Sequence, residues 1–339
     1  MKAVAATRKG HVEVVDIPRP DYAPYECLVR VRACGICNST DLKILDNELS
    51  DLDVQYPCIL GHESVGEVVE VGDQVRYIEP GDIFTNPVGR LAEDSDYGAM
   101  FGAMKDYAIV QDHRAMDELG VDEDLYTGFW TRPAPAGIPF EDATILLTLK
   151  ESYSALKNFG FCAGMDVLVY GDGPVGLALV SFLRMGDAGW VGCIGHHDDR
   201  LGKAKEIGGA DLAVNAHAAD VDEALAERKF DMVIDAVGKT SIILDSSRRL
   251  KPGGKVCVYG VLKKKDSMIS LLDLQNHTSV HMLNWPVGEH DVHEEVVRMV
   301  LDGLVAPRDF YSHVMPVDEA PEAVRMIRER EAFKVVLTF

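Results

Sequence analysis

Apolar and polar residues alternate in the first part of the chain. Three short stretches rich in β-forming residues, Lys2–Ala5, His11–Asp16 and Leu28–Ala33, are separated by prolines. A fourth alternating run of valines extends from Val65 to Val75. Short strands at even spacing, with turn residues between them, are typical of small barrels. The pattern therefore predicts a small β-barrel-like domain in this part of the chain.

From residue 166 onward, continuous apolar runs replace the alternation. Such runs suit parallel strands that are covered on both faces, and helix-like segments such as Asp199–Ile207 lie between them. The predicted strands are Val167–Tyr170, Trp190–Gly195, Leu212–Val214, Asp231–Ala236, Lys255–Gly260 and His277–Trp285. A helix with apolar residues at spacings of three and four is expected over Glu294–Leu304. Alternation of this kind predicts an α/β fold with a doubly wound parallel sheet.

Three glycines follow the first of these strands with the spacing G-x-G-x-x-G. Gly171 suits a tight turn, Gly173 a close approach of the backbone to a pyrophosphate, and Gly176 close packing of strand against helix. Pro174 and Val175 begin the helix, whose free N–H groups and dipole favour a bound diphosphate. The sequence therefore predicts a dinucleotide site, and Val237, directly after the strand Asp231–Ala236, is counted among its contacts.

The end of the second predicted strand bears on which dinucleotide is preferred. Enzymes for NAD usually end this strand in an acid that accepts hydrogen bonds from the ribose and repels a 2′-phosphate. Gly195 stands at that place, and His196, His197 and Arg200 follow as donors for a phosphate. Preference for NADP is the prediction, with NAD as the alternative if this segment is a solvated turn that does not discriminate.

Composition excludes several classes of partner. The chain has 339 residues and a formal net charge of -21, which disfavours nucleic acid and anionic membranes because both carry the same sign. No apolar segment approaches the length of a membrane span, and no signal-peptide pattern is present, so a cytoplasmic location is expected. Seven cysteines, an odd number in a long chain, indicate reduced thiols rather than a disulfide framework.

Several motifs together resemble one family. GHE at residues 61–63 is followed by glycines and valines that end in GD, GIC precedes it, and YGDGPVG follows at residues 170–176. This combination is similar to the zinc-type medium-chain dehydrogenases/reductases, which include alcohol, polyol and sugar dehydrogenases. The resemblance extends to the closing AFKVVLTF and implies a split chaperonin-10-like β-barrel catalytic domain over residues 1–148 and 288–339. A Rossmann nucleotide domain is then expected over residues 149–287.

The resemblance also implies a catalytic zinc site. Carried over residue by residue, Cys37 and His62 are two ligands and Glu63 is an adjacent carboxylate that ligates or orients. Thiolate and imidazole suit zinc, and a catalytic site keeps one position open for substrate. The usual third ligand falls on Leu147, which cannot bind metal, so either Glu63 or Glu151 completes the site or the metal has been lost. The four cysteines of a structural zinc lobe are absent, so no structural zinc is expected.

A hydroxyl after the cysteine ligand relays a proton in the family. Ser39 is the favoured candidate on spacing and Thr40 the alternative, although both residue types are also common helix caps. Cys34 and Cys37 form C-x-x-C, but no thioredoxin-like strand order surrounds them, which disfavours a redox dithiol. Lys334 is interpreted either as a contact to a cofactor phosphate or as a surface lysine.

These observations lead to one main hypothesis and two rivals. The main hypothesis is a nicotinamide-dependent oxidoreductase, zinc-assisted and NADP-preferring, that interconverts a small-molecule alcohol and its carbonyl as a homodimer or homotetramer. A polyol, sugar or amino-sugar substrate is expected by analogy with those branches of the family. The first rival is a metal-free NADPH reductase of an activated C=C or C=N bond. The second is a dinucleotide-binding protein without catalytic activity.

Overall fold

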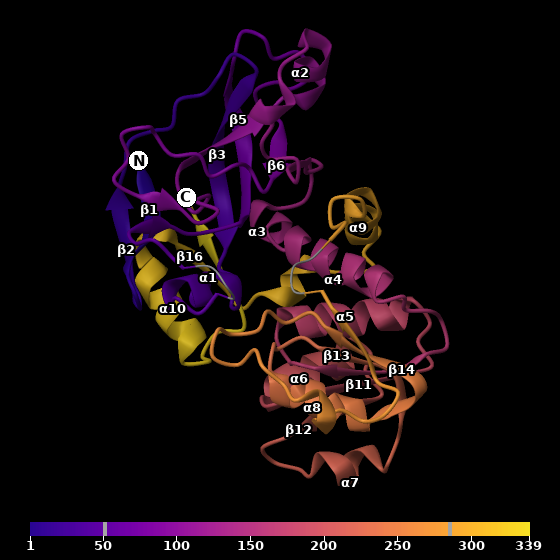
Figure 1. Ribbon diagram of the computed structural model, residues 1–339. Helices are drawn as coiled ribbons and strands as arrows, with labels where there is room; N and C mark the ends of the chain where they lie inside the picture. Colours follow the sequence, from indigo (N-terminus) through magenta and orange to yellow (C-terminus); the bar gives the residue numbers. More distant parts are fainter. Residues whose placement is uncertain (50–52, 284–286) are drawn as a thin grey trace. The chain divides into compact units, whose positions relative to one another are not determined.

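The computed structural model describes residues 1–49, 53–283 and 287–339, which fall into two compact units (Figure 1). The first unit comprises residues 1–48, the described residues up to 147, and residues 297–339. The second comprises residue 49 and the described residues from 148 to 296. Each unit has its own sheets and its own buried core.

The first unit is built on two sheets. Its strands are β1 (Lys2–Arg8), β2 (His11–Asp16), β3 (Glu26–Gly35), β4 (Cys58–Ile59), β5 (Glu63–Val71), β6 (Ile83–Thr85), β7 (Gly98–Ala99), β8 (Tyr107–Gln111), β9 (Arg132–Pro133), β16 (His313–Pro316) and β17 (Val335–Thr338). One sheet has the order β2-β1-β4-β7, and the other has the order β16-β17-β3-β5-β6-β9 with β8 also paired to β3. The long strand β3 is therefore central, with three neighbouring strands.

Helices and 3-10 turns connect these strands. They are α1 (Thr40–Leu45), α2 (His113–Leu119), η1 (Glu123–Leu125), α3 (Phe140–Ala143), η3 (Pro307–Phe310), η4 (Val317–Glu319) and α10 (Ala320–Arg328). Helix α2 begins because the Asp112 carboxylate accepts a hydrogen bond from the amide of Ala115, and it ends at Gly120 in the left-handed conformation. The sequence pattern did not predict this helix, because the surrounding segment lacks a clear apolar period.

The second unit contains one parallel sheet of six strands. These are β10 (Asp166–Tyr170), β11 (Trp190–Gly195), β12 (Leu212–Asn215), β13 (Phe230–Asp235), β14 (Leu250–Val258) and β15 (Ser279–Met282). Their order, β12-β11-β10-β13-β14-β15, reverses direction between β10 and β13. The predicted doubly wound sheet is confirmed, and the reversal is the place where such sheets bind ligands.

Four helices and a 3-10 turn lie in the described connections between the parallel strands. They are α5 (Pro174–Met185), α6 (Asp198–Glu206), α7 (Val221–Leu225), α8 (Thr240–Arg248) and η2 (Leu271–Asp273). Helix α4 (Leu146–Asn158) precedes the sheet and α9 (His293–Leu301) follows it, and both cross a boundary between the two units. Helix α5 follows the N-cap residue Gly173 with a proline at its first position, and most of its side chains are buried. Its apolar faces are the reason it lies in the interior of the unit.

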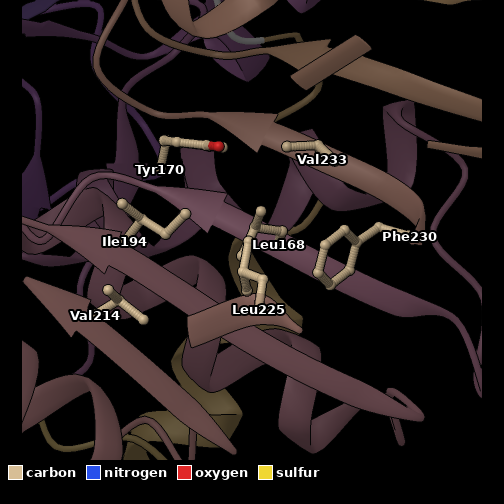
Figure 2. Close-up of a cluster of buried hydrophobic side chains, with 7 residues drawn as sticks. All are labelled: Leu168, Tyr170, Ile194, Val214, Leu225, Phe230 and Val233. Carbon is tan, nitrogen blue, oxygen red and sulfur yellow. The ribbon is translucent and has the colours of Figure 1, made fainter. Parts of the chain in front are cut away.

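One face of the parallel sheet buries a continuous apolar cluster. Figure 2 shows its seven residues, contributed by four strands and by helix α7. They are Leu168, Tyr170, Ile194, Val214, Leu225, Phe230 and Val233. Phe230 and Leu168 are fully buried, and burial of such side chains contributes about 1.5–3 kcal/mol each relative to exposure. These side chains pack β10, β11, β12, β13 and helix α7 together.

The observed strands differ from several predicted ones by a few residues, and two of them differ most. Strand β14 begins at Leu250 and pairs with β13 across an irregularity in register, so KPGG lies inside the strand rather than before it. Strand β15 covers Ser279–Met282 only, and the last two positions of the predicted strand, 284 and 285, lie outside the described residues. Among the residues that the structure describes, no helix is long and apolar enough to cross a membrane.

Candidate active site

Strand β3 brings three distant segments of the first unit together. Its last residue, Gly35, pairs with Glu63 at the start of β5 on one side and with Val336 of β17 on the other. Cys37 follows Gly35 by two residues, and Lys334 directly precedes β17. The pairing register therefore places Cys37, Glu63 and Lys334 at one end of β3.

The ligand atoms of Cys37, His62 and Glu63 lie within 4.8 Å of one another. Cys37 and His62 are half-buried, and Glu63 is buried. A thiolate, an imidazole and a carboxylate at this separation are a donor set that suits Zn²⁺. The structure thus brings together three of the four candidate metal ligands within the first unit.

Asp41 holds the backbone and the side chains of this cluster in place. Its Oδ2 accepts a hydrogen bond from the Cys37 amide at 2.8 Å, and its Oδ1 lies 3.6 Å from His62 Nδ1. Metal-binding histidines usually turn their second ring nitrogen toward a carboxylate in this way. Without a cation, burial lowers the pKa of His62, but Asp41 and the Cys37 sulfur outweigh it and raise that pKa above its usual range. The cluster therefore attracts positive charge.

Ser39 and Thr40 begin helix α1 beside Cys37. The Thr40 amide donates to Cys37 Sγ at 3.3 Å, which stabilises a thiolate. Ser39 stands at the N-cap position, yet its hydroxyl makes no capping bond and instead accepts a hydrogen bond from Lys43 Nζ at 2.8 Å. The interpretation of Ser39 as a side-chain helix cap is therefore wrong.

Lys334 is buried beside Glu63. Its Nζ lies 2.5 Å from Glu63 Oε2, and both side chains are only 3% exposed. Burial lowers the pKa of Lys334, but Glu63 and the other nearby anions outweigh it and raise the pKa above its usual value. The alternative of a surface lysine is wrong, because the closing strand β17 draws this residue into the sheet that carries the cluster.

The glycine loop of the second unit has three distinct backbone environments. Gly171 has a φ of 125°, which disfavours any other residue. A Cβ on Gly176 would lie 1.8 Å from the carbonyl oxygen of Gly171, so strand and helix meet at this point. A Cβ on Gly173 would meet nothing within 4 Å, and Gly173 is the N-cap of α5. Pro174 and Val175 form the first turn of that helix, where amide groups are available for an anion.

The second residue of the glycine loop, Asp172, reaches the end of β11. Its Oδ2 accepts hydrogen bonds from the amides of His196 and His197 at 2.7 and 2.8 Å and lies 2.9 Å from His197 Nδ1. Burial raises the pKa of Asp172, but these donors outweigh it and lower the pKa below its usual value. The ring of His196 stacks on that of His217, with 4.1 Å between centroids. The segment after β11 is therefore fixed by Asp172.

The remaining predicted residues lie in different surroundings. Val237, directly after β13, is 39% exposed, and its side chain lies beside Gly171. Arg200 lies in the first turn of α6 and is half-buried. Leu147 and Glu151 are both in α4, and a carboxylate oxygen of Glu151 accepts a hydrogen bond from the Tyr259 hydroxyl at 3.1 Å. Glu151 is part of the second unit, whereas Cys37, His62 and Glu63 are part of the first.

Sequence reasoning did not assign roles to Asp41, Asp172 or Lys43. Asp41 follows Cys37 by four residues across the start of a helix, and this spacing was a usable signal for a supporting carboxylate. Asp172 gave a weaker signal, because its contact with the end of β11 depends on the sheet being formed. Lys43 gave no signal in the sequence, since a lysine four residues after a serine is a common spacing in helices.

The chain combines a parallel sheet that carries a glycine loop with a separate β-rich unit that carries a thiolate–imidazole–carboxylate cluster. This combination defines a two-domain dehydrogenase. Family models agree with this class: residues 23–118 match the alcohol dehydrogenase GroES-like domain, and residues 174–302 match the zinc-binding dehydrogenase domain. The chain belongs to the zinc-type medium-chain dehydrogenase/reductase family. The expected chaperonin-10-like barrel is thereby confirmed.

Individual relatives are similar over most or all of the chain. Human sorbitol dehydrogenase is 24% identical over 346 residues, covering 97% of this chain and 93% of the relative. L-threonine 3-dehydrogenase of Pyrococcus horikoshii is 29% identical over 278 residues, covering 78% and 77%. Among solved structures, an alcohol dehydrogenase from Thermus sp. ATN1 is 26% identical with a TM-score of 0.80 and full coverage of both chains.

A protein of the zinc-binding dehydrogenase type from Sinorhizobium meliloti 1021, solved with NADP bound, is 25% identical. Its TM-score is 0.77, with coverage of 100% of this chain and 99% of the other. Together with the fold and the family, these similarities identify the chain as a nicotinamide-dependent oxidoreductase that interconverts a small-molecule alcohol and its carbonyl.

Proposed function

We propose that this enzyme is a zinc-assisted, NADP-preferring dehydrogenase of a polyol, sugar or amino-sugar. The observation that carries the proposal is the cluster of Cys37, His62 and Glu63, whose ligand atoms lie within 4.8 Å of one another. These residues would hold the metal, and His62 would offer Nε2 because its Nδ1 faces Asp41. Bound zinc would polarise the alcohol oxygen and lower its pKa. With Glu63 as the third ligand, the metal site needs no ligand from position 147, where Leu147 stands, and none from Glu151.

The hydroxyl of Ser39 is the group that we propose transfers the proton of the substrate alcohol. Ser39 is two residues from Cys37, and its hydroxyl accepts from Lys43 Nζ, so the Ser39 hydrogen remains available to donate. In the oxidation of an alcohol, Ser39 would receive the hydroxyl proton and pass its own hydrogen to water, because Ser39 is only half-buried; Thr40 is the alternative relay. A bound nicotinamide would supply the hydride-accepting chemistry, which belongs to the cofactor.

The segment after β11 supports a preference for NADP. Gly195 offers no carboxylate to a ribose hydroxyl, while the side chains of His196 and Arg200 offer donors for a 2′-phosphate. The predicted donor His197 is engaged with Asp172 through its amide and its Nδ1. Asp172 is the anion nearest to this segment, and one of its oxygens is already occupied by three N–H groups. Repulsion of a phosphate by this carboxylate is therefore reduced.

An aromatic side chain beside the metal cluster supports a carbohydrate-like substrate. Phe101 is 46% exposed, and its ring centroid lies 5.0 Å from that of His62. Phe101 also adopts a positive φ of 63°, a strained conformation for a bulky residue that concentrates at functional sites. An exposed ring of this kind packs against the C–H face of a sugar or polyol while the hydroxyls remain solvated. The named relatives, sorbitol dehydrogenases among them, agree with this substrate class.

A homo-oligomer is proposed from the edge of the parallel sheet. Strand β15 is the last in the strand order and exposes Val280 and Met282. Leu271 and Leu272, in the segment before it, are 78% and 95% exposed. An edge strand next to large exposed apolar residues favours pairing with a second copy of the chain.

The test is metal content by mass spectrometry on protein purified without chelator, together with kcat/KM for NADP and NAD on a panel of polyols and sugars. About one zinc per chain and turnover of alcohols with NADP are expected. Absence of metal with retained NADPH oxidation would favour a metal-free reductase instead. Tight NADPH binding with no turnover of any alcohol or carbonyl would favour a protein without catalytic activity.

A further inference from the structure

Lys334 and Glu63 form a buried ion pair at one of the proposed metal ligands. Lys334 Nζ lies 2.5 Å from Glu63 Oε2, and each side chain is 3% exposed. A charge that is buried without a partner costs several kcal/mol, so these two groups require each other. Since the ammonium is directed at Oε2, the carboxylate has one oxygen engaged and one oxygen to offer a cation.

The backbone fixes this arrangement. A Cβ on Gly35 would lie 2.4 Å from Glu63 Oε2 and 3.2 Å from Lys334 Cε. The pair thus fills the space in which a side chain at position 35 would lie. Gly35 is paired with Glu63 on one neighbouring strand and with Val336 on the other, so the sheet register sets the contact.

Among Lys334 and the three anionic groups that act on it, the charges balance when a divalent cation is counted as well. The Cys37 thiolate, Glu63 and Asp41 carry three negative charges. A divalent metal and the Lys334 ammonium carry three positive charges. Neutrality is favourable in a buried site, where charges are weakly screened. Without Lys334, the same ligands and a divalent metal would retain one net negative charge.

We propose that Lys334 is a positioning residue of the metal site that restricts Glu63 to ligation through a single oxygen. The inference rests on the proposed metal site and extends it. With Oε2 held by the ammonium, Cys37, His62 and Glu63 would supply three ligand atoms to the metal and would leave a fourth position open for the substrate oxygen. Without the ammonium, Oε2 is released and competes for that fourth position.

The experiment uses the full-length protein loaded with Co²⁺, whose visible absorption reports coordination number, and measures Zn²⁺ affinity by chelator competition. In Lys334→Met, the visible absorption should weaken as the coordination number rises, and Zn²⁺ should bind at least about tenfold more tightly because a nearby positive charge is lost. Lys334→Arg retains the charge and the donor groups, and should restore both values toward those of the wild type.

Two further variants separate this role from a general effect of losing a buried lysine. Lys105 is also fully buried, and its ammonium donates to the Arg90 carbonyl, so Lys105→Met is the matched control that should leave the Co²⁺ spectrum unchanged. In a Glu63→Gln background, Lys334→Met should produce no further spectral change, because Lys334 acts through Glu63. That double variant also removes both buried charges, which favours folding if Lys334→Met alone does not fold.

The outcomes distinguish failure of the proposed metal site from failure of the proposed role of Lys334. Wild-type protein that binds neither Co²⁺ nor Zn²⁺ would overturn the metal site and, with it, the role of Lys334. Wild-type protein that binds metal, with a spectrum and affinity unchanged in Lys334→Met, would overturn only the positioning role. A spectral change that persists in the Glu63→Gln background would also overturn it.

Discussion

The carboxyl group of Asp172 fills the space that a side chain at Gly195 would need. A Cβ on Gly195 would lie 2.4 Å from Asp172 Oδ2 and 2.5 Å from its Cγ. A side chain at position 195 would therefore collide with Asp172 in the position that it occupies here. We expect cofactor preference to depend on positions 172 and 195 together.

Gly195→Asp alone should not produce an NAD enzyme. Its side chain collides with Asp172 and adds a second carboxylate, so we expect loss of stability and poor use of both cofactors. Gly195→Asp combined with Asp172→Gly removes the collision and should lower the ratio of kcat/KM for NADP over NAD by about tenfold or more. A stable single variant that prefers NAD would contradict this account.

Arg200→Ala should weaken the use of NADP selectively. A charge-assisted hydrogen bond to a phosphate is worth about 1.5–3 kcal/mol, which corresponds to roughly a ten- to hundredfold lower kcat/KM with NADP. The value with NAD should change little, because NAD lacks the 2′-phosphate. An equal loss of kcat/KM with both cofactors would show that Arg200 supports the fold of this segment rather than binding the 2′-phosphate.

Cys37→Ser should abolish stoichiometric zinc and lower kcat/KM for alcohol oxidation by at least about a hundredfold, the usual effect of losing a group that stabilises developing charge. Metal analysis and steady-state kinetics test this together. Cys162→Ser, an exposed thiol in the second unit, is the control and should retain both metal and activity. Full activity in metal-free Cys37→Ser would contradict zinc-assisted chemistry.

The buried side chain of Lys105 should make the free energy of unfolding depend on pH. Burial, with a smaller contribution from Arg90, lowers the pKa of Lys105 to about 7 from an ordinary value of 10.5. Between these values the unfolded chain binds more protons than the native one, so the unfolding free energy should rise with pH, at about 1.4 kcal/mol per pH unit. Urea unfolding of wild type and Lys105→Met from pH 6 to about 10 tests this: the wild type should gain stability relative to the variant as pH rises.

Leu271→Glu with Leu272→Glu should yield monomers. The two leucines are among the most exposed apolar side chains and precede the edge strand β15, so charges at these positions oppose association of two copies. Light scattering coupled to size-exclusion chromatography measures the mass of the particle. Leu125→Glu, at an exposed leucine of the first unit, is the control and should leave that mass unchanged.

The sequence alone determined those features that depend on neighbouring residues. The runs of apolar residues defined the parallel strands, and the G-x-G-x-x-G spacing defined the turn between β10 and α5. The GHE and GIC motifs pointed to Cys37, His62 and Glu63. Each of these signals is contained in a short segment, because the strand period, the glycine turn and the helix start are set by local backbone geometry.

Tertiary structure decided the contacts between distant segments. Lys334 reaches Glu63 only because β17 and β5 both pair with β3, and a shift of one residue in either register would turn the side chains to the other face of the sheet. Asp172 meets the end of β11 only once these strands are adjacent. The sequence by itself identified the chemical groups of the site, whereas strand register decided which of them lie within reach of one another.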